Sequence, residues 1–243
     1  MAGHDLVIHA GALKYVPEAE WNAFEALGVN VEGSANVAKA ATRTGVATVV
    51  GISTDKACRP VNVYGATKML LERLFSEAAR WGGPAFITCR YGNVVGSTGS
   101  VIPLFQEQLK AKGRVSLTDP NMTRFWLSPS EAVTLVLWTA ENAEKYRGSV
   151  IIPRCAAMRM GDLATAIAGE AVELIGPRPG EKQHEELVQY EESGRVEQMG
   201  GYYRLSPLGE PESSQRWTYA SHTPAHWVEV PEMREMIEEA SKI

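Results

Sequence analysis

The sequence predicts an α/β fold built around a parallel sheet, on three observations. Short apolar runs alternate with amphipathic stretches through the first half of the chain. The runs have the length of buried strands, and the stretches between them are long enough for crossover helices. The composition is ordinary for a globular protein, with 44% apolar and 22% charged residues. Together these features are typical of βαβ units with right-handed crossovers.

The first half of the chain supplies the elements of this sheet. Strands are expected at residues 6–10, 46–52 and 85–91, and helices at residues 29–44 and 64–79. Each strand is a short apolar run that suits burial on both faces, as strands of a parallel sheet require. The earlier helix ends at Gly45, and its apolar stripe is expected to face the core. That stripe consists of Val29, Gly33, Val37, Ala40 and Ala41.

The second half of the chain has a less regular pattern. Helices are expected at residues 101–112, 129–144, 160–168 and 232–242, and a strand at residues 149–153. Ser128 is a suitable N-cap for the second of these helices, since its hydroxyl accepts hydrogen bonds from free backbone amides. The segment from Gly176 to the last helix is interpreted as mostly loop.

Composition also limits the compartment and the partners. The net charge of −5 gives no electrostatic reason to expect nucleic acid. No apolar run reaches the roughly 18 residues that cross a membrane, and the N-terminus lacks the basic segment of a signal peptide. The three cysteines are widely spaced, and Pro224 interrupts the pair His222 and His226. We therefore expect a cytoplasmic protein with reduced cysteines, no metal and no membrane contact.

A first candidate for chemistry is the pair Tyr64 and Lys68. The two residues are four positions apart on a predicted helix, so their side chains share one face. A lysine ammonium beside a phenol favours the phenolate, which lets tyrosine act as a base near neutral pH. The same spacing is common on solvent-exposed helices. Here the helix follows a buried strand, and ligands of open α/β sheets bind at the carboxyl ends of strands.

The carboxyl end of that strand carries a second candidate. Thr54, Asp55 and Lys56 place a hydroxyl, a carboxyl and an amine at consecutive positions. One interpretation is a turn followed by a helix cap, since threonine and aspartate are common there. The other is an acid–base pair whose pKa values are separated by their surroundings. The nearby Tyr64 and Lys68 favour the catalytic interpretation.

Six segments in order carry a resemblance to a known family. They are His9–Pro17, Ser53–Ala57, Tyr64–Lys68, Arg90–Gly96, Met122–Trp126 and Arg178–Lys182. Together they resemble the inverting UDP-N-acetylglucosamine 4,6-dehydratases of polysaccharide biosynthesis, which are extended short-chain dehydrogenases/reductases. The resemblance extends from Asp5 to about Leu208. It implies a Rossmann-like doubly wound parallel sheet with a smaller C-terminal α/β lobe that binds substrate.

One departure from the family pattern concerns the dinucleotide. Such enzymes begin with a GxGxxG turn that holds the pyrophosphate at a helix N-terminus. This sequence has none, because the glycine-rich segments 92–99 and 176–182 have other spacings. We therefore expect an incomplete sheet that lacks a first βαβαβ half of ~60–80 residues. The strand at residues 6–10 would then have an open edge, covered by a separate chain, by self-association or by a rearranged N-terminus.

The resemblance implies catalytic roles for Thr54, Asp55, Lys56, Tyr64 and Lys68. Tyr64 and Lys68 would serve hydride transfer from the sugar C4 to NADP or NAD. Lys56 would remove the C5 proton, Asp55 would protonate the departing C6 hydroxyl, and Thr54 would hydrogen-bond the C4 oxygen. Hydride return to C6 and reprotonation of C5 from the opposite face would give an inverted 4-keto-6-deoxy sugar.

The resemblance also implies two sets of binding residues. The cofactor positions are Ala10, Gly11, Ala12, Tyr64, Lys68, Tyr91, Gly92, Asn93 and Val94. The nucleotide-sugar positions are Lys14, Asn93, Arg124, Arg178 and Glu181. Arginine suits a diphosphate because its planar fork donates two hydrogen bonds at once. Without the resemblance, the substrate set would be interpreted as scattered surface charges.

The expected organisation follows from these assignments. Residues 1–97 would form the C-terminal half of a Rossmann-like domain with the catalytic residues. Residues 98–243 would form mainly the substrate-binding lobe, with returning segments packed on the Rossmann part. The leading hypothesis is a UDP-N-acetylglucosamine 4,6-dehydratase that forms a homo-oligomer or needs a separate chain to complete the binding of NADP or NAD. The alternatives are a non-catalytic nucleotide-sugar-binding or assembly module, and an epimerase or reductase of the same superfamily.

Overall fold

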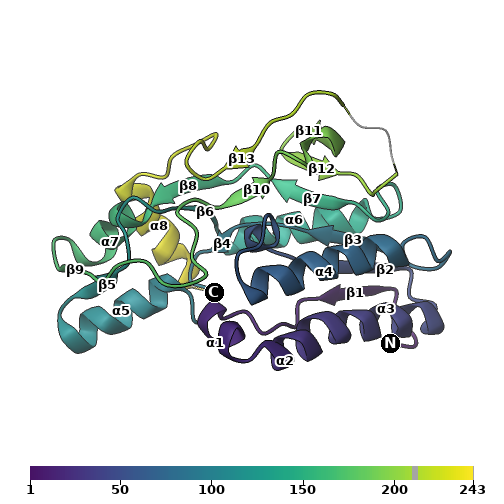
Figure 1. The fold of residues 1–243 in the computed structure, drawn as a ribbon, viewed down its shortest axis with the longest axis horizontal. Coiled ribbons are helices and arrows are strands. Elements are labelled where there is room, and N and C mark those ends of the chain that lie inside the picture. Colours follow the sequence, from purple (N-terminus) through teal and green to yellow (C-terminus); the bar gives the residue numbers. More distant parts are fainter. Residues whose placement is uncertain (210–212, 243) are drawn as a thin grey trace. The chain divides into compact units, whose positions relative to one another are not determined.

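The computed structural model describes residues 1–209 and 213–242, which fold into two compact units (Figure 1). The first unit comprises Met1–Tyr91, Val133–Arg154 and Glu186–Tyr219. The second unit comprises Gly92–Ala132, Cys155–Glu185 and Ala220–Ile243. Each unit has its own sheet and its own hydrophobic core.

A six-stranded sheet forms the centre of the first unit. In spatial order, its strands are β1 (Leu6–His9), β2 (Thr48–Ile52), β3 (Ala85–Cys89), β7 (Val150–Pro153), β12 (Tyr202–Leu205) and β11 (Val196–Met199). The pairs from β1 to β7 are parallel, and β12 and β11 are added to them antiparallel. The predicted α/β fold with a mostly parallel sheet is confirmed.

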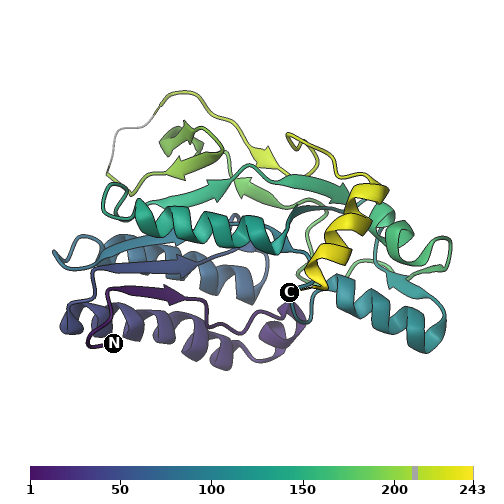
Figure 2. The ribbon, with the colours of Figure 1, turned by 180° about the vertical axis from the view of Figure 1, so that it is seen from behind.

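Helices pack on both faces of this sheet (Figure 2). The helical segments of this part of the chain include α1 (Val16–Trp21), α2 (Ala23–Ala26), a π-helical segment (Leu27–Glu32), α3 (Gly33–Thr44), α4 (Val63–Ala78) and α6 (Pro129–Glu141). Helices α3 and α4 cover one face, and α6, the teal helix in front of the strands in Figure 2, covers the other. Within residues 1–209 and 213–242, no helix is long and apolar enough to cross a membrane.

Alternation along the strands builds a core on each side of the sheet. Val49 of β2 and Phe86 of β3 pack against Phe75 of α4. Their chain neighbours Val50 and Ile87 point the other way and pack with α6. All five side chains are completely removed from solvent. Each such burial contributes about 1.5–3 kcal/mol to stability, so the sheet is held firmly from both faces.

The buried face of α3 differs from the predicted stripe. The buried residues are Asn30, Ser34, Ala38 and Ala41, so the prediction is confirmed at Ala41 and was one position early at Val29, Gly33 and Val37. Ser34 lies inside because its hydroxyl donates to the Asn30 carbonyl at 2.5 Å and bonds His9 Nε2 at 2.9 Å. The small side chains of Ala38 and Ala41 allow close packing against the sheet. Hydrogen bonding therefore outweighs the hydrophobic pattern here.

Strand β1 lies at the edge of the sheet and pairs with β2 alone among the described strands. Val7 packs against the core under α3 and α4, whereas Leu6 and Ile8 are 41% and 47% exposed. The expectation that this strand is buried on both faces was wrong. Residues 1–5 form turns and pair with no described strand, so they do not extend the sheet beyond β1.

The segment expected to be mostly loop contains short strands. It holds β10 (Glu186–Val188), β11, β12 and β13 (Tyr219–Ala220). In the hairpin of β11 and β12, Glu197 lies opposite Arg204, and their charged groups are 3.5 Å apart. These strands lack an apolar run of their own, which is why the sequence pattern missed them. Strand β12 pairs with β7, which is already buried, and β11 pairs with β12. Strands β10 and β13 pair with each other.

The second unit consists of small sheets and three helices. Its strands are β4 (Asn93–Val94), β6 (Thr123–Leu127) and β8 (Ala156–Arg159) in one sheet, and β5 (Val115–Leu117) and β9 (Val172–Leu174) in another. Its helices are α5 (Val101–Lys112), α7 (Met160–Ala168) and α8 (Val230–Ala240). The helices predicted at residues 101–112 and 160–168 are confirmed, and the last helix begins two residues earlier than predicted.

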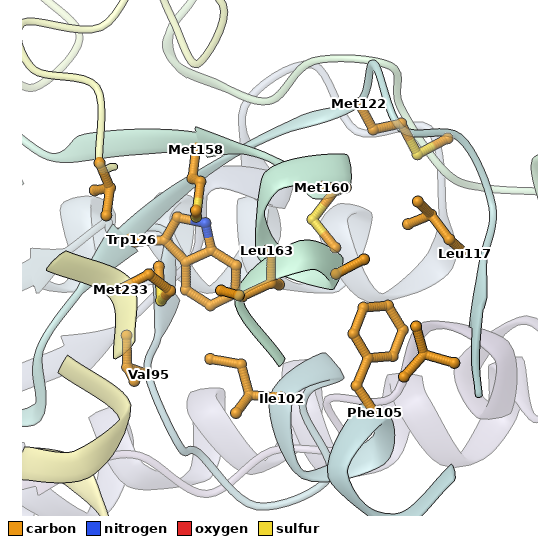
Figure 3. Close-up of a cluster of buried hydrophobic side chains, with 14 residues drawn as sticks. Val95, Ile102, Phe105, Leu117, Met122, Trp126, Met158, Met160, Leu163 and Met233 are labelled. Atoms are coloured by element: carbon orange, nitrogen blue, oxygen red, sulfur yellow. The ribbon is translucent and has the colours of Figure 1, made fainter. Parts of the chain in front are cut away.

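A cluster of large apolar side chains holds the second unit together (Figure 3). Trp126 of β6 is 1% exposed and lies among Met158, Leu163 and Met233, which come from β8, α7 and α8. Because methionine is flexible, it fills the irregular space around the indole. This core fixes β6, the strand that carries Arg124.

Candidate functional site

The first part of the site is the turn that follows β2. The 3₁₀ helix η2 (Asp55–Ala57) begins there, and the Thr54 hydroxyl caps it by accepting the backbone amide of Lys56 at 3.4 Å. The amide of Asp55 donates to the carbonyl of Tyr91 at 2.9 Å. The chain leaving β2 therefore stays aligned with the chain leaving β3. The turn-and-cap interpretation of this triplet is correct for the backbone, and it leaves the side chains available for chemistry.

The side chains of the triplet form a compact acid–base group. Asp55 is completely buried, and its Oδ1 accepts from the Thr54 hydroxyl at 2.8 Å and from Lys56 Nζ at 3.0 Å. The Lys56 side chain is 21% exposed. At this distance the carboxyl and the amine form an ion pair. The turn therefore places an acidic group and a basic group side by side.

Helix α4 packs against this turn through its first residues. The Asn62 side chain caps the helix by accepting the amide of Gly65 at 2.7 Å. A Cβ at Gly65 would overlap the carbonyl oxygen of Lys56 and lie 2.9 Å from the carbonyl carbon. Only glycine permits this approach of the helix to the turn. The contact brings Tyr64 next to Thr54, Asp55 and Lys56.

Tyr64 is influenced by all three residues of the triplet. Burial raises the pKa of its phenol to about 12, the charge of Lys56 lowers this pKa, and that of Asp55 raises it. A hydrogen bond with Thr54 also lowers it. The sequence interpretation assigned the lowering to Lys68, whereas the structure assigns it to Lys56. Because burial dominates, the phenol holds its proton at neutral pH in the described structure.

Lys68 lies one helical turn further along α4 and is almost completely buried. Its ammonium donates to the backbone carbonyl of Ile52 at 2.7 Å, at the last residue of β2. Burial lowers the pKa of Lys68 to about 8, and the carboxylate of Glu72 opposes this change. Burial and the charge of Lys68 together lower the pKa of His9 on β1. Lys68 therefore connects α4 to the ends of β1 and β2.

The loop after β1 contains the expected cofactor positions Ala10, Gly11 and Ala12 and the expected substrate position Lys14. Gly11 is exposed, and a Cβ there would meet nothing within 4 Å, so space is open beside the backbone. The ammonium of Lys14 lies 5.9 Å from the centre of the Tyr15 ring. Burial lowers the pKa of Lys14.

Asn30, which the sequence analysis did not single out, holds this loop. Its amide group bonds both backbone groups of Leu13, at 2.8 and 3.0 Å, and donates to Thr67 of α4 at 2.9 Å. Asn30 is completely buried and lies in the π-helical segment. Segments of this kind occur frequently at functional sites. A polar residue inside the apolar pattern of residues 27–31 was the available signal.

The expected cofactor positions after β3 are divided between the two units. Tyr91 belongs to the first unit, where burial raises the pKa of its phenol and the charges of Cys89 and Tyr64 act in the same direction. Gly92 and β4, which consists of Asn93 and Val94, belong to the second. A Cβ at Gly92 would overlap the Phe125 side chain, so β4 lies close against β6.

The expected substrate residues Arg124, Arg178 and Glu181 belong to the second unit. Arg124 is 8% exposed and donates to the carbonyls of Lys182 and Gln183 at 3.0 and 3.3 Å. Its guanidinium is thus used to hold the loop that carries Arg178. Glu181 accepts the backbone amide of Arg178 at 3.2 Å, and the Arg178 side chain is exposed.

A buried ionic group lies behind the catalytic candidates and was also missed. Arg90 is 2% exposed and donates to Glu72 at 2.9 and 2.7 Å and to the carbonyl of Leu187 at 3.0 Å. It also pairs with Glu192. Glu72 accepts the Ser53 hydroxyl at 2.6 Å. The sequence signals for this group were Arg90 directly after an apolar strand and Glu72 on the buried side of a helix.

Fold and site together define a class of protein. A parallel sheet, a crossover helix with a tyrosine–lysine pair, and a reactive turn at the carboxyl end of the neighbouring strand are the features of Rossmann-like short-chain dehydrogenases/reductases. The match to sequence families is more specific. Residues 1–207 match the polysaccharide biosynthesis protein family, and the chain belongs to it. The predicted family resemblance is confirmed.

Its relatives carry different names. The chain is 41% identical over 208 residues to a UDP-N-acetylglucosamine 4,6-dehydratase (inverting) of Campylobacter jejuni. It is also 41% identical over 213 residues to a UDP-glucose 4-epimerase of Rickettsia bellii. Each alignment covers 84% of this chain and 62% of the relative. An uncharacterised membrane protein of Methanocaldococcus jannaschii is 42% identical over 84% of this chain and 66% of that protein. The chain therefore spans less than two thirds of the length of these relatives.

Solved structures share the fold. Pen from Bacillus thuringiensis superposes with a TM-score of 0.91 at 32% identity, over 100% of this chain and 77% of Pen. DesIV of Streptomyces venezuelae, a dTDP-glucose 4,6-dehydratase solved with NAD, superposes with a TM-score of 0.69 at 20% identity. That match covers 75% of this chain and 64% of DesIV. At this identity the second likeness concerns the fold alone.

Proposed function

We propose that the chain carries the catalytic part of a nucleotide-sugar 4,6-dehydratase that acts on a UDP-linked N-acetylhexosamine, with inversion at C5. The observation that carries this proposal is the ion pair of Asp55 and Lys56 beside Tyr64. Elimination of water from C5 and C6 needs a base for the C5 proton and an acid for the C6 hydroxyl. A carboxyl and an amine 3.0 Å apart supply both.

The residues present fit the nicotinamide–ribose end of NADP or NAD. Tyr64 and Lys68 occupy one face of α4 beside the carboxyl end of β2, and the backbone at Gly11 borders open space. Ala10, Ala12 and Tyr91 to Val94 would complete this region. When bound, the oxidised dinucleotide would supply a hydride acceptor and a positive charge that lowers the pKa of a neighbouring phenol. The chain contributes no glycine-rich turn for the pyrophosphate.

The proton transfers can be assigned to this chain's own side chains. Tyr64 takes the proton of the C4 hydroxyl, while Thr54 donates to the C4 oxygen and Lys68 fixes the helix that presents the phenol. A proton first moves from Lys56 to Asp55 within the ion pair. Neutral Lys56 then removes the C5 proton, and protonated Asp55 gives its proton to the departing C6 hydroxyl, which restores the ion pair without a change in its total charge. Hydride return to C6 and reprotonation of C5 from the opposite face would give the inverted 4-keto-6-deoxy product.

Substrate binding involves mainly the second unit in this proposal. Arg178 is exposed and supplies a guanidinium for the diphosphate, with Lys14 and Asn93 as further contacts. Arg124 and Glu181 position the loop that carries Arg178, because their polar groups bond the backbone of that loop.

A 4-epimerase is the second candidate, because relatives with that name are equally similar to the chain. An epimerase removes and returns hydride at C4 and leaves C5 and C6 unchanged. It has no use for an acid and a base at C5 and C6, so Asp55 and Lys56 favour the dehydratase. A binding or assembly module would use neither the pair nor Tyr64.

The test incubates the chain with NADP or NAD and UDP-N-acetylglucosamine and follows the sugar nucleotide by mass spectrometry. A dehydratase gives a product lighter by one water, and Tyr64→Phe is expected to lower its rate by about 10²- to 10⁴-fold. A C4 epimer of unchanged mass would support the epimerase instead. The incubation is repeated with a chain that supplies the glycine-rich dinucleotide-binding half. Binding of the nucleotide sugar without conversion in either mixture would support the module.

The edge of the sheet leads to a prediction about assembly. We infer that β1 pairs with another chain, because its free backbone groups and the exposed Leu6 and Ile8 form an open template for strand pairing. The chain is expected to form a homo-oligomer, or a complex with a chain that completes dinucleotide binding. Ile8→Lys should weaken assembly in analytical ultracentrifugation, whereas Leu208→Lys, at a residue 60% exposed, should not. A monomer at all concentrations whose β1 amides exchange freely would contradict this inference.

A further inference from the structure

Glu72 continues the face of α4 that carries Tyr64 and Lys68, at the same four-residue spacing. Each member of this face contacts one of the three consecutive residues 52–54, at or just after the end of β2. Tyr64 bonds Thr54, Lys68 bonds the Ile52 carbonyl, and Glu72 bonds the Ser53 hydroxyl at 2.6 Å. Glu72 therefore holds the residue that immediately precedes the catalytic triplet.

Arg90 fixes Glu72 in turn. Two guanidinium nitrogens donate to the two carboxylate oxygens of Glu72, a bidentate geometry that sets the orientation of both groups. The same guanidinium pairs with Glu192 and donates to the Leu187 carbonyl. Burial acts against its charge, but the carboxylates of Glu72 and Glu192 outweigh this and raise the pKa of Arg90. One buried cation thus joins α4, β10 and the turn at Glu192.

The group of Arg90, Glu72 and Glu192 has one positive charge and two negative charges, all on side chains at most 5% exposed. A protonated Lys68, one helical turn before Glu72 on α4, supplies a compensating positive charge. Because an unbalanced charge is costly in the interior, the two carboxylates favour the ammonium form of Lys68.

We propose that Glu72 and Arg90 are positioning residues of the site: they hold Ser53 and α4 in register and keep Lys68 positively charged. The inference deepens the proposed function, in which Lys68 acts beside Tyr64. Other titratable or charged groups of this region are His9 on β1, Asp55 and Lys56 on η2, Cys58 after η2, Tyr64 on α4, Tyr91 after β3 and the buried Arg195. None of these is a fully buried carboxylate bonded to both Ser53 and Arg90.

The test measures the pKa of Lys68 directly, by NMR of the full chain with isotope-labelled lysine side chains. Lys68→Arg identifies the signal. In the wild type the pKa is expected near 8. Glu72→Gln removes the charge and should lower it by about one unit or more. Glu72→Asp keeps the charge and should leave it within a few tenths of a unit. The matched control is Glu77→Gln, at an exposed position of the same helix, and it should have no effect.

Turnover supplies the second readout. Glu72→Gln should move the alkaline limb of the pH profile to lower pH, and Glu72→Asp should lower kcat by about tenfold to a hundredfold with little change in KM. An unchanged Lys68 pKa in folded Glu72→Gln would overturn the proposal. If that variant does not fold, a wild-type pKa below 7, or a wild-type kcat in Glu72→Asp, overturns it. If the wild type makes no 4-keto sugar, the proposed function fails. The NMR result still decides whether the carboxylate of Glu72 raises the pKa of Lys68.

Discussion

Asp55→Asn is expected to lower formation of the 4-keto-6-deoxy sugar by about 10²- to 10⁴-fold. Asparagine keeps the size of the side chain and an oxygen that accepts from Thr54 and Lys56. It holds no acidic proton for the departing C6 hydroxyl. The turn after β2 should therefore stay folded while elimination stops.

The same variant separates proton removal from elimination. In deuterium oxide, Lys56 is still able to exchange the C5 proton of a substrate oxidised at C4. Mass spectrometry should therefore find deuterium in recovered substrate with Asp55→Asn and none with Lys56→Met. Asp5→Asn, at an exposed position, is the matched control and should behave as the wild type. A wild-type rate with Asp55→Asn would remove Asp55 from the mechanism.

Gly65→Ala is expected to lower turnover by about a hundredfold and the free energy of unfolding by about 1–3 kcal/mol. The added Cβ overlaps the Lys56 carbonyl oxygen, which is backbone and cannot move aside as a flexible side chain would. Either α4 or η2 must shift. Tyr64 and Asp55 then lose their shared position beside Thr54.

The matched control for this variant is Gly33→Ala in the first turn of α3. Gly33 has helical φ and ψ angles of −56° and −45°, and a Cβ there would meet its nearest atom at 3.6 Å. Stability should be unchanged or rise by about 0.4–1 kcal/mol, because alanine restricts the unfolded chain. Urea denaturation measures stability, and product formation measures turnover. Wild-type turnover in Gly65→Ala would show that close packing of helix and turn is not required.

The pH dependence of the wild type follows from Lys68. Its pKa in the folded chain is about 8, below the ordinary value for lysine. The ammonium is therefore present below pH 8 and is lost as the pH rises through this value. Turnover should fall with it on the alkaline side.

The strands and the large helices of the first half could be predicted from the sequence. Apolar runs such as residues 48–52 form strands because a parallel sheet covered on both faces buries every side chain of a short apolar run. The buried face of α3 could not be predicted, because Asn30 and Ser34 enter the interior through partners at positions 13, 67 and 9. Strand β12 depends on pairing with β7, a contact between distant parts of the chain, and β11 pairs with β12.

By itself, the sequence determined the class of fold, the family and the order of the candidate residues Thr54, Asp55, Lys56, Tyr64 and Lys68. These depend on local patterns and on motifs whose spacing is visible along the chain. Only the tertiary structure decided which charges act on which groups. In the structure, the charge of Lys56 lowers the pKa of Tyr64. Glu72 bonds Ser53 and Arg90, and Arg124 bonds the backbone of a loop. Electrostatic effects depend on distance and burial, and folding brings together groups that lie far apart in the sequence.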